Sequence, residues 1–265
     1  MNRTESKVII QGEPLATVLF SGDVTRGDVI LIHGFTGSKE DFTEIAELIA
    51  EHGYRVLSFD NRGQFESSHS ERSDAYTMDS FARDAVELAA HFKMERPHVL
   101  GHSFGGLVAQ EAVMQNPGLW KSLTLMCSGP GGRPWRTMEP ALEEINSLTM
   151  QQIWFKYFDV DRKAHPRYEI HKKRWIASDG RSTLAQRNQL MYQPSLVADL
   201  AQLKIPTHVI YGENDDAWPI PDQIEMADVL SAKVTVLPGC GHCPNEDNPA
   251  LTAKALTDFW DLIPN

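Results

Sequence analysis

The 265-residue chain has only three cysteines, Cys127, Cys240 and Cys243. So sparse and odd a set cannot form the disulfide framework of a small secreted domain, and we expect a cytoplasmic protein in a reducing compartment. A local disulfide between Cys240 and Cys243 stays open. Residues 1–14 lack a long apolar stretch, and no run approaches the roughly 20 apolar residues of a membrane span, so we expect neither a secretory signal nor a membrane partner.

Positive charge is also scarce. The chain has 25 Lys and Arg against 36 Asp and Glu, which gives a formal net charge of -11. A protein that follows nucleic-acid phosphates needs a basic face, so we expect no nucleic-acid partner. Hydrophobic residues make up 42% of the chain, an ordinary globular value. The expected partner is a small-molecule substrate, and both a monomer and a homodimer remain open.

Short β-rich runs alternate with amphipathic helical patterns. Several runs are almost continuously apolar, as strands covered on both faces of a parallel sheet are. The expected strands cover residues 29–33, 54–60, 98–103, 122–128, 207–213 and 233–238, and the expected helices cover 39–52, 78–92, 105–115, 221–230 and 249–262. VIIQ and ATVLF near the N-terminus predict an antiparallel hairpin. The fold class is therefore α/β, with a mostly parallel central sheet flanked by helices.

The alternation stops after about residue 130. Residues 131–203 contain consecutive helical patterns without a convincing strand. A helical insertion between two strands predicts a cap, or lid, over one end of the sheet. We therefore expect a core domain formed by residues 1–130 and 204–265, with the cap at 131–203.

The motif GHSFGG, residues 101–106, contains the pattern G-x-S-x-G. It follows an apolar strand and opens a helix, which is the context of a nucleophile elbow. Such a turn exposes Ser103 at the end of the strand. The start of the following helix offers backbone N–H groups to a developing oxyanion.

A nucleophilic serine needs a base, and the base needs an orienting acid. A strand runs into NDDAWP, where Asp215 and Asp216 compete for the role of acid, and the next strand ends in LPGCGH, which places His242 in the following loop. All these candidates follow the carboxyl ends of strands, the edge where open α/β sheets bind their ligands. The spacing alone leaves the choice between the two aspartates open.

An oxyanion site also needs two N–H donors. The helix start supplies the N–H of Phe104, and HGF after an early strand has the position and flexibility to supply that of Phe35. We interpret His33 as a hydrogen-bonding residue that stabilises the turn.

In order along the chain, HGF, FDNRG, GHSFGG, a helical segment, GENDDAWP and GCGHCPNEDNP resemble the α/β-hydrolase family over essentially the whole sequence. In the family pattern G-x-x-D-x-x-x-P the acid matches Asp215 and not Asp216. The resemblance implies a serine hydrolase with the triad Ser103, His242 and Asp215, an acyl-enzyme, oxyanion donors at Phe35 and Phe104, and no metal or cofactor.

The substrate class implied by the resemblance is a small to medium apolar carboxylic ester or lactone. Three alternatives stay open: hydrolysis of C–C bonds, cofactor-free perhydrolysis, and a slow ligand receptor on the same scaffold. Trp135 and Trp154 are candidate substrate contacts of the cap, where ordinary helix packing is the competing interpretation, and Trp218 is a candidate contact close to Asp215. HKKRW, residues 171–175, could attract a carboxylate or form a solvated helix face.

Two further details carry expectations. Where many family members read D-x-R-G-H-G, this chain has Gln64 and Phe65, which we expect at the rim of the pocket.

Cys-Gly-His-Cys, residues 240–243, also resembles a redox dithiol. Such a site needs a helix directly at its first cysteine, whereas the next helix is expected only at Asn248-Pro249. A zinc site would need a further ligand cluster, and Cys127 is a poor completion. We therefore assign His242 to catalysis.

Overall fold

The computed structural model describes residues 1–23, 26–133 and 142–264. Its centre is an eight-stranded sheet in the order β1-β2-β4-β3-β5-β6-β7-β8. The strands are β1 (Asn2–Ile10), β2 (Glu13–Ser21), β3 (Gly27–Ile32), β4 (Tyr54–Phe59), β5 (His98–His102), β6 (Ser122–Met126), β7 (Thr207–Gly212) and β8 (Lys233–Leu237). β1 and β2 pair antiparallel, β2 also pairs antiparallel with β4, and the other neighbours are parallel. The predicted α/β class with a mostly parallel sheet is confirmed.

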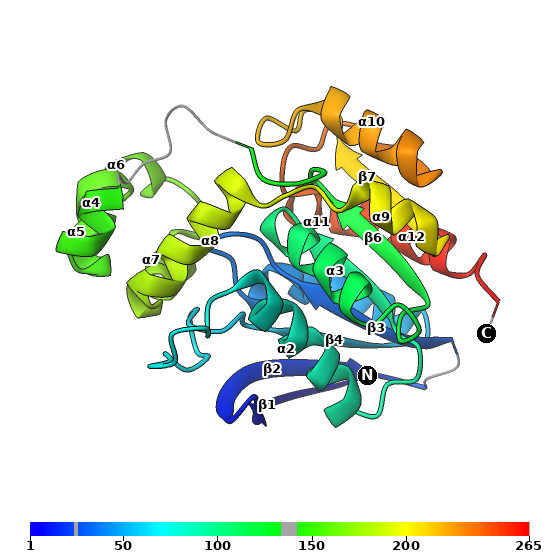
Figure 1. Cartoon of the computed structure of the whole chain (residues 1–265), viewed down its shortest axis with the longest axis horizontal. Helices are drawn as coiled ribbons and strands as arrows, with labels where there is room; N and C mark the ends of the chain where they lie inside the picture. Colours follow the sequence, from blue (N-terminus) through cyan, green and yellow to red (C-terminus); the bar gives the residue numbers. More distant parts are fainter. Residues whose placement is uncertain (24–25, 134–141, 265) are drawn as a thin grey trace.

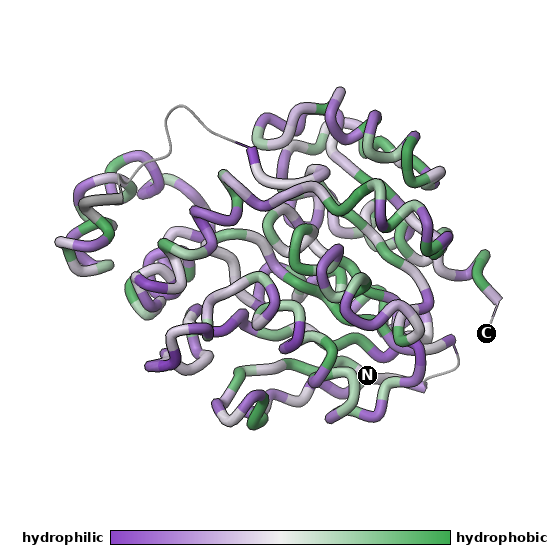
Figure 2. The backbone as a smooth tube through the Cα atoms, in the orientation of Figure 1, coloured by the Kyte–Doolittle hydropathy of each residue, from purple (hydrophilic) through white to green (hydrophobic). Residues whose placement is uncertain are grey.

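Helices cover both faces of this sheet (Figure 1). α1 (Thr43–Glu51) and α12 (Pro249–Trp260) pack together on one face. On the other face α2 (Met78–His91) packs on α3 (Phe104–Gln115), and α9 (Val197–Leu203) lies between α3 and α10 (Ile220–Leu230). Burial from both sides explains the apolar central strands, which are green in Figure 2. In β3, for example, residues 29–32 are all fully buried.

Five helices stand between β6 and α9 in the described part of the chain, and we call them the inserted helices. They are α4 (Leu142–Ser147), α5 (Met150–Tyr157), α6 (Asp159–Arg162), α7 (Tyr168–Ala177) and α8 (Gly180–Tyr192). In Figure 1, α4 to α7 project beyond one end of the sheet. α9 also lies within the range expected for the cap, but it packs on the helices that cover the sheet. The cap boundaries stay a prediction.

The structure corrects two local expectations. The N-terminal hairpin is longer than predicted, because β1 begins at Asn2 and its polar residues pair with β2 at the exposed edge of the sheet. A short helix, α11 (Pro244–Asp247), precedes α12, so the expected absence of a helix before Asn248 was wrong. One further short helix, η1 (Lys39–Phe42), leads into α1. Over the described residues, no helix combines the length and the apolar character needed to cross a membrane.

Candidate active site

Ser103 stands at the turn between β5 and α3 with φ 54° and ψ -119°. This is an unusual conformation for a residue with a side chain, and it is held by the neighbouring strand. The Ser103 N–H donates to the Met126 carbonyl at 2.9 Å, and the Ser128 hydroxyl donates to the Ser103 carbonyl at 2.8 Å. The turn therefore presents the Ser103 side chain beyond the end of β5.

Two glycines allow the close backbone approaches that this site requires. A Cβ atom on Gly105 would lie 2.1 Å from the Ile32 carbonyl oxygen, so α3 could not pack against β3 with any larger residue there. A Cβ atom on Gly212 would lie 2.1 Å from the Gly241 carbonyl oxygen. The absence of a side chain at position 212 thus lets the loop that carries His242 lie against the end of β7.

His242 lies between the other two predicted triad residues. Its Nδ1 is 2.9 Å from Asp215 Oδ1, and its Nε2 is 3.1 Å from Ser103 Oγ. Because the Asp215 carboxylate can only accept, Nδ1 carries the proton and Nε2 is the acceptor for the serine hydroxyl. The structure therefore brings together all three residues in the order that nucleophile activation requires.

The Asp215 carboxylate is buried and held by several donors. Oδ1 also accepts from the N–H groups of Ala217 and Trp218, and Oδ2 accepts from Gln223 Nε2 at 2.9 Å. Burial acts to raise the pKa of Asp215, but the hydrogen bonds and the interaction with His242 outweigh it and lower that pKa below its usual value. Asp216, by contrast, is exposed to solvent.

The backbone of Gly34 and Phe35 passes close to the serine. A Cβ atom on Gly34 would lie 3.1 Å from Ser103 Cβ. Within the described residues, neither the Phe35 N–H nor the Phe104 N–H donates a hydrogen bond. Phe104 is the first residue of α3, so its N–H has no partner inside the helix either. Both predicted oxyanion donors are therefore free beside Ser103.

His33 supports this loop from beneath. Its ring donates from Nδ1 to the Gly34 carbonyl at 2.9 Å and accepts from the Asn61 N–H at Nε2 at 3.0 Å. Burial lowers the pKa of His33 to about 4, so the ring is neutral at physiological pH. The expected role of His33 as a turn-stabilising residue is confirmed.

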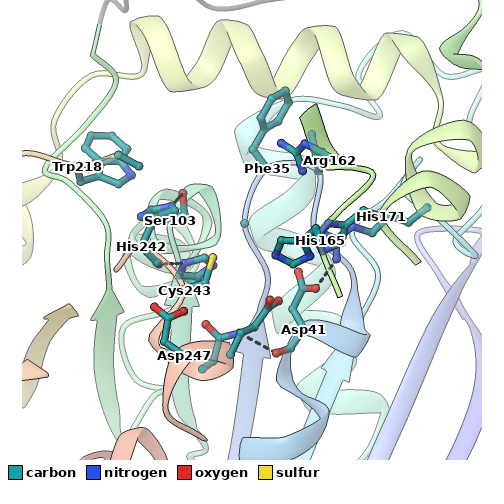
Figure 3. Close-up of a pocket in the computed structure, with 18 of the residues that line it drawn as sticks. Phe35, Asp41, Ser103, Arg162, His165, His171, Trp218, His242, Cys243 and Asp247 are labelled. Atoms are coloured by element: carbon teal, nitrogen blue, oxygen red, sulfur yellow. Dashed lines mark hydrogen bonds and ion pairs between the residues drawn. The ribbon is translucent and has the colours of Figure 1, made fainter. Parts of the chain in front are cut away.

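A cavity of about 600 Å³ opens above Ser103 and His242 (Figure 3). Phe35, Leu190 and Trp218 give it apolar surface. Its wall formed by α6, α7 and the segment between them is polar and contains Asp161, Arg162, His165, His171 and Arg174. Within the described residues, no phenylalanine, tyrosine or tryptophan of the inserted helices lines this cavity.

The predicted tryptophan contacts have three outcomes. Trp218 is buried and lines the cavity beside Ser103, as Figure 3 shows. Trp154 does not reach this cavity, because it packs with Phe158 and Trp175 inside the inserted helices and lines only a smaller adjoining space of about 120 Å³. Trp135 lies outside the described residues.

Gln64 and Phe65 do not line the cavity either, so their expected place at its rim was wrong. Both side chains are buried beneath the inserted helices, and the Phe65 N–H donates to Ser178 Oγ at 3.2 Å. Lys39 and Lys173 lie over the Phe65 ring. Phe65 therefore joins the loop after β4 to α7.

Cys127, Cys240 and Cys243 are free thiols. Cys127 lies at the end of β6, where its Sγ, a carboxylate oxygen of Asp215 and a ring nitrogen of His242 fall within 4.8 Å of one another. Burial raises the pKa of Cys127 well above its usual value, so it is not a thiolate, and the other two groups already bind each other. This geometry fits a metal poorly because a metal needs a deprotonated thiolate.

Comparison with known proteins identifies the family of this chain. The family model described as "Alpha/beta hydrolase family" matches residues 29–255 of this chain. The chain belongs to the alpha/beta hydrolase family.

The relatives of this alpha/beta hydrolase have diverse names, and their sequence identity to it is low. Lipase 3 of Moraxella sp. is 28% identical over 255 residues, which cover 90% of this chain and 79% of the lipase. A non-heme haloperoxidase of Rhodococcus erythropolis is 25% identical, covering 85% of this chain and 89% of its own. The solved enol-lactonase of Burkholderia xenovorans superposes with a TM-score of 0.81 at 17% identity, covering 97% of this chain and 100% of its own. The last likeness shows the shared fold alone.

Several cavity residues were missed by the sequence reasoning. Arg162 and His165 lie in DVDRKAH, which has the composition of a solvated helix end and carries no motif. His102, inside the elbow motif, had no role assigned to it from the sequence, yet its Nε2 lies 2.8 Å from the His242 carbonyl oxygen. The available signal was its place at the end of the expected strand, directly before Ser103.

Proposed function

We propose that this alpha/beta hydrolase is a serine hydrolase that cleaves carboxylic esters or lactones through an acyl-enzyme. The observation that carries the proposal is the position of His242, which reaches Ser103 Oγ with one ring nitrogen and Asp215 Oδ1 with the other. The family membership supports hydrolysis. A small-molecule substrate fits the cavity of about 600 Å³ above the serine.

The reaction follows from the proton positions. His242 Nε2 takes the Ser103 hydroxyl proton as Oγ attacks the carbonyl carbon, and the resulting imidazolium is stabilised by the Asp215 carboxylate. The imidazolium then gives that proton to the leaving alkoxide, which departs as an alcohol. Water then enters, and His242 removes its proton as the water oxygen attacks the acyl carbon. When the Oγ–acyl bond breaks, the imidazolium returns the proton to Ser103 Oγ and the acid leaves.

In this mechanism the oxyanion of each tetrahedral intermediate is bound by the N–H groups of Phe35 and Phe104. Both donors are free in the described part of the chain and are fixed by backbone that other contacts hold in place. Removal of one such donor typically costs about 2.7–4 kcal/mol of transition-state stabilisation. Preorganised amides are effective because they need not reorient when the charge develops.

The decisive experiment combines labelling with turnover. A fluorophosphonate probe should label wild type at Ser103, as peptide mass spectrometry would show, and should not label Ser103→Ala. A panel of p-nitrophenyl esters and lactones should be hydrolysed by wild type with multiple turnovers and left intact by Ser103→Ala. Equal hydrolysis by the variant would reject the proposal. Labelling without multiple turnover would instead indicate a slow receptor.

A further inference from the structure

The inserted helices bring three nitrogen-bearing side chains to the cavity, and we call them the Arg–His cluster: Arg162, His165 and His171. Arg162 ends α6, His171 lies in α7, and His165 lies in the segment between them. All three line the same cavity as Ser103, and the rings of His165 and His171 have centroids 4.8 Å apart. In Figure 3 the cluster lies on one side of Phe35, with Ser103 and His242 on the other.

The cluster has unused hydrogen-bonding capacity. His171 is only 8% exposed, yet neither of its ring nitrogens has a partner in the described structure. The Arg162 guanidinium lies 5.2 Å from the centre of the Phe158 ring, and no carboxylate of the described residues forms an ion pair with it. Buried polar groups are almost always hydrogen-bonded in folded proteins, so the two nitrogens of His171 are suited to a ligand. Arg162 is exposed, which leaves its guanidinium accessible to the same ligand.

Unlike Arg162, two neighbouring arginines form ion pairs with residues that the structure describes. Arg174 forms an ion pair with Asp41, and Arg167 forms ion pairs with Asp41 and Glu246. These contacts satisfy the two arginines within the protein. Arg162 thus stands out at the cavity, since its charge has no acidic partner among the residues that the structure describes.

The charge balance identifies the kind of ligand. Burial, together with nearby Arg174, lowers the pKa of His171 to about 3, so this ring is neutral and Arg162 supplies a full positive charge. Asp41, Asp161, Glu246 and Asp247 also line the cavity, and their negative charges disfavour a dianion such as a phosphate. A guanidinium with adjacent imidazole N–H donors matches a single carboxylate, which it can bind through two oxygens.

We propose that the Arg–His cluster binds a free carboxylate of the substrate, so that the preferred substrate is an ester or lactone with an acid group remote from the carbonyl that Ser103 attacks. This inference rests on the proposed function, because it names the substrate class of the same site. The protein has a net charge of -11, so the attraction is local to the cluster and not a property of the surface.

The test compares substrates that differ only in this charge. Mono-p-nitrophenyl esters of glutaric, adipic and pimelic acid are compared with the same esters in which the free acid is a carboxamide, and the rate with Ser103→Ala is subtracted. For the best chain length, wild type should prefer the carboxylate in kcat/KM by about tenfold or more, the effect of one charge-assisted hydrogen bond. Equal rates for both members of every pair would overturn the proposal.

Three consecutive residues provide matched variants. Arg162→Gln should remove most of the preference for the carboxylate, whereas Asp161→Asn should increase it because a negative charge of the cavity wall is lost. Lys163→Gln removes a positive charge one residue away, from an exposed side chain that does not line the cavity, and should leave the preference unchanged. A preference that persists in Arg162→Gln would also overturn the proposal.

A measurement on wild type covers the case in which Arg162→Gln does not fold. Adipate should inhibit hydrolysis of p-nitrophenyl butyrate competitively at constant ionic strength, and adipamide should inhibit at least tenfold more weakly. Equal inhibition would contradict the carboxylate site. If Ser103→Ala hydrolysed the butyrate as fast as wild type, the proposed function itself would fail, which separates the two outcomes.

Discussion

The imidazole of His102 lies against that of His242, with ring centroids 4.9 Å apart and with His102 Nε2 2.8 Å from the His242 main-chain carbonyl oxygen. Burial, with the nearby His242, lowers the pKa of His102 to about 4. The ring is therefore neutral at pH 7, and its Nε2–H donates to that carbonyl. His102 thus ties the loop after β8 to the end of β5.

We predict that His102 positions the proposed base through this hydrogen bond. His102→Phe keeps a ring but loses the donor, so kcat should fall by about tenfold while KM changes little, the loss expected from one hydrogen bond. His102→Gln can still donate to the carbonyl and should recover part of kcat. Steady-state kinetics on an ester that wild type hydrolyses provides the measurement. Equal losses in the two variants would argue against positioning through this bond.

Substitution of each aspartate in turn tests the assignment of Asp215, rather than Asp216, as the acid of the triad. Asp215→Asn should preserve the packing but stabilise the wrong tautomer of His242, and kcat should fall by about 10⁴-fold. Asp216→Asn is the matched control, because Asp216 lies one residue further and is exposed, whereas the described partner of His242 Nδ1 is Asp215. Its kcat should equal that of wild type. A large loss in the control and a small one in Asp215→Asn would reverse the assignment.

The elbow and the loops after β7 and β8 were predictable because each lies at the end of a strand whose apolar run is evident in the sequence. Parallel strands then bring Ser103, Asp215 and His242 to one edge of the sheet, whatever the details of packing. The cavity wall was not predictable in this way. Arg162 and His171 reach the cavity because α6 and α7 lie beside Phe35 and α7 is tied to η1 by the Arg174–Asp41 ion pair, and no local pattern encodes those long-range contacts.

A buried histidine remote from the site should make stability depend on pH. His98 is fully buried, its Nδ1 lies 2.6 Å from Ser122 Oγ, and burial, with Lys121 nearby, lowers its pKa to about 3. The unfolded state, with a pKa near 6.5, binds this proton first as pH falls. The contribution of His98 to folding stability is therefore fully present above about pH 6.5 and is lost progressively down to about pH 3.

The titration of His98 should lower the free energy of unfolding by about 2 kcal/mol at pH 5 relative to pH 8. His98→Phe keeps an aromatic ring beside Trp260 and removes the titrating group, so its stability should decline less between pH 8 and pH 5. Urea unfolding at each pH gives the comparison. His91→Phe, which replaces an exposed histidine at the end of α2, is the control and should follow wild type. A decline in His98→Phe as steep as in wild type would refute the linkage.

The last prediction concerns the ion pair between Asp41 of η1 and Arg174 of α7, which joins the core to the inserted helices. Each side chain is only 9% exposed. Burial acts to raise the pKa of Asp41, but Arg174, His33 and Arg167 outweigh it and lower that pKa below its usual value. Asp41→Asn retains an acceptor for the Ser38 N–H but leaves Arg174 buried without its carboxylate. We expect a loss of about 3 kcal/mol in unfolding free energy, since breaking one partner of a buried pair is strongly destabilising.

The double variant Asp41→Asn/Arg174→Met should recover part of that loss, because it also removes the buried charge that Asp41→Asn leaves unpaired. Urea denaturation of wild type, both single variants and the double variant completes the thermodynamic cycle. If the double variant lost the sum of the two single losses, the residues would act independently, and the ion pair would not be what joins α7 to the core.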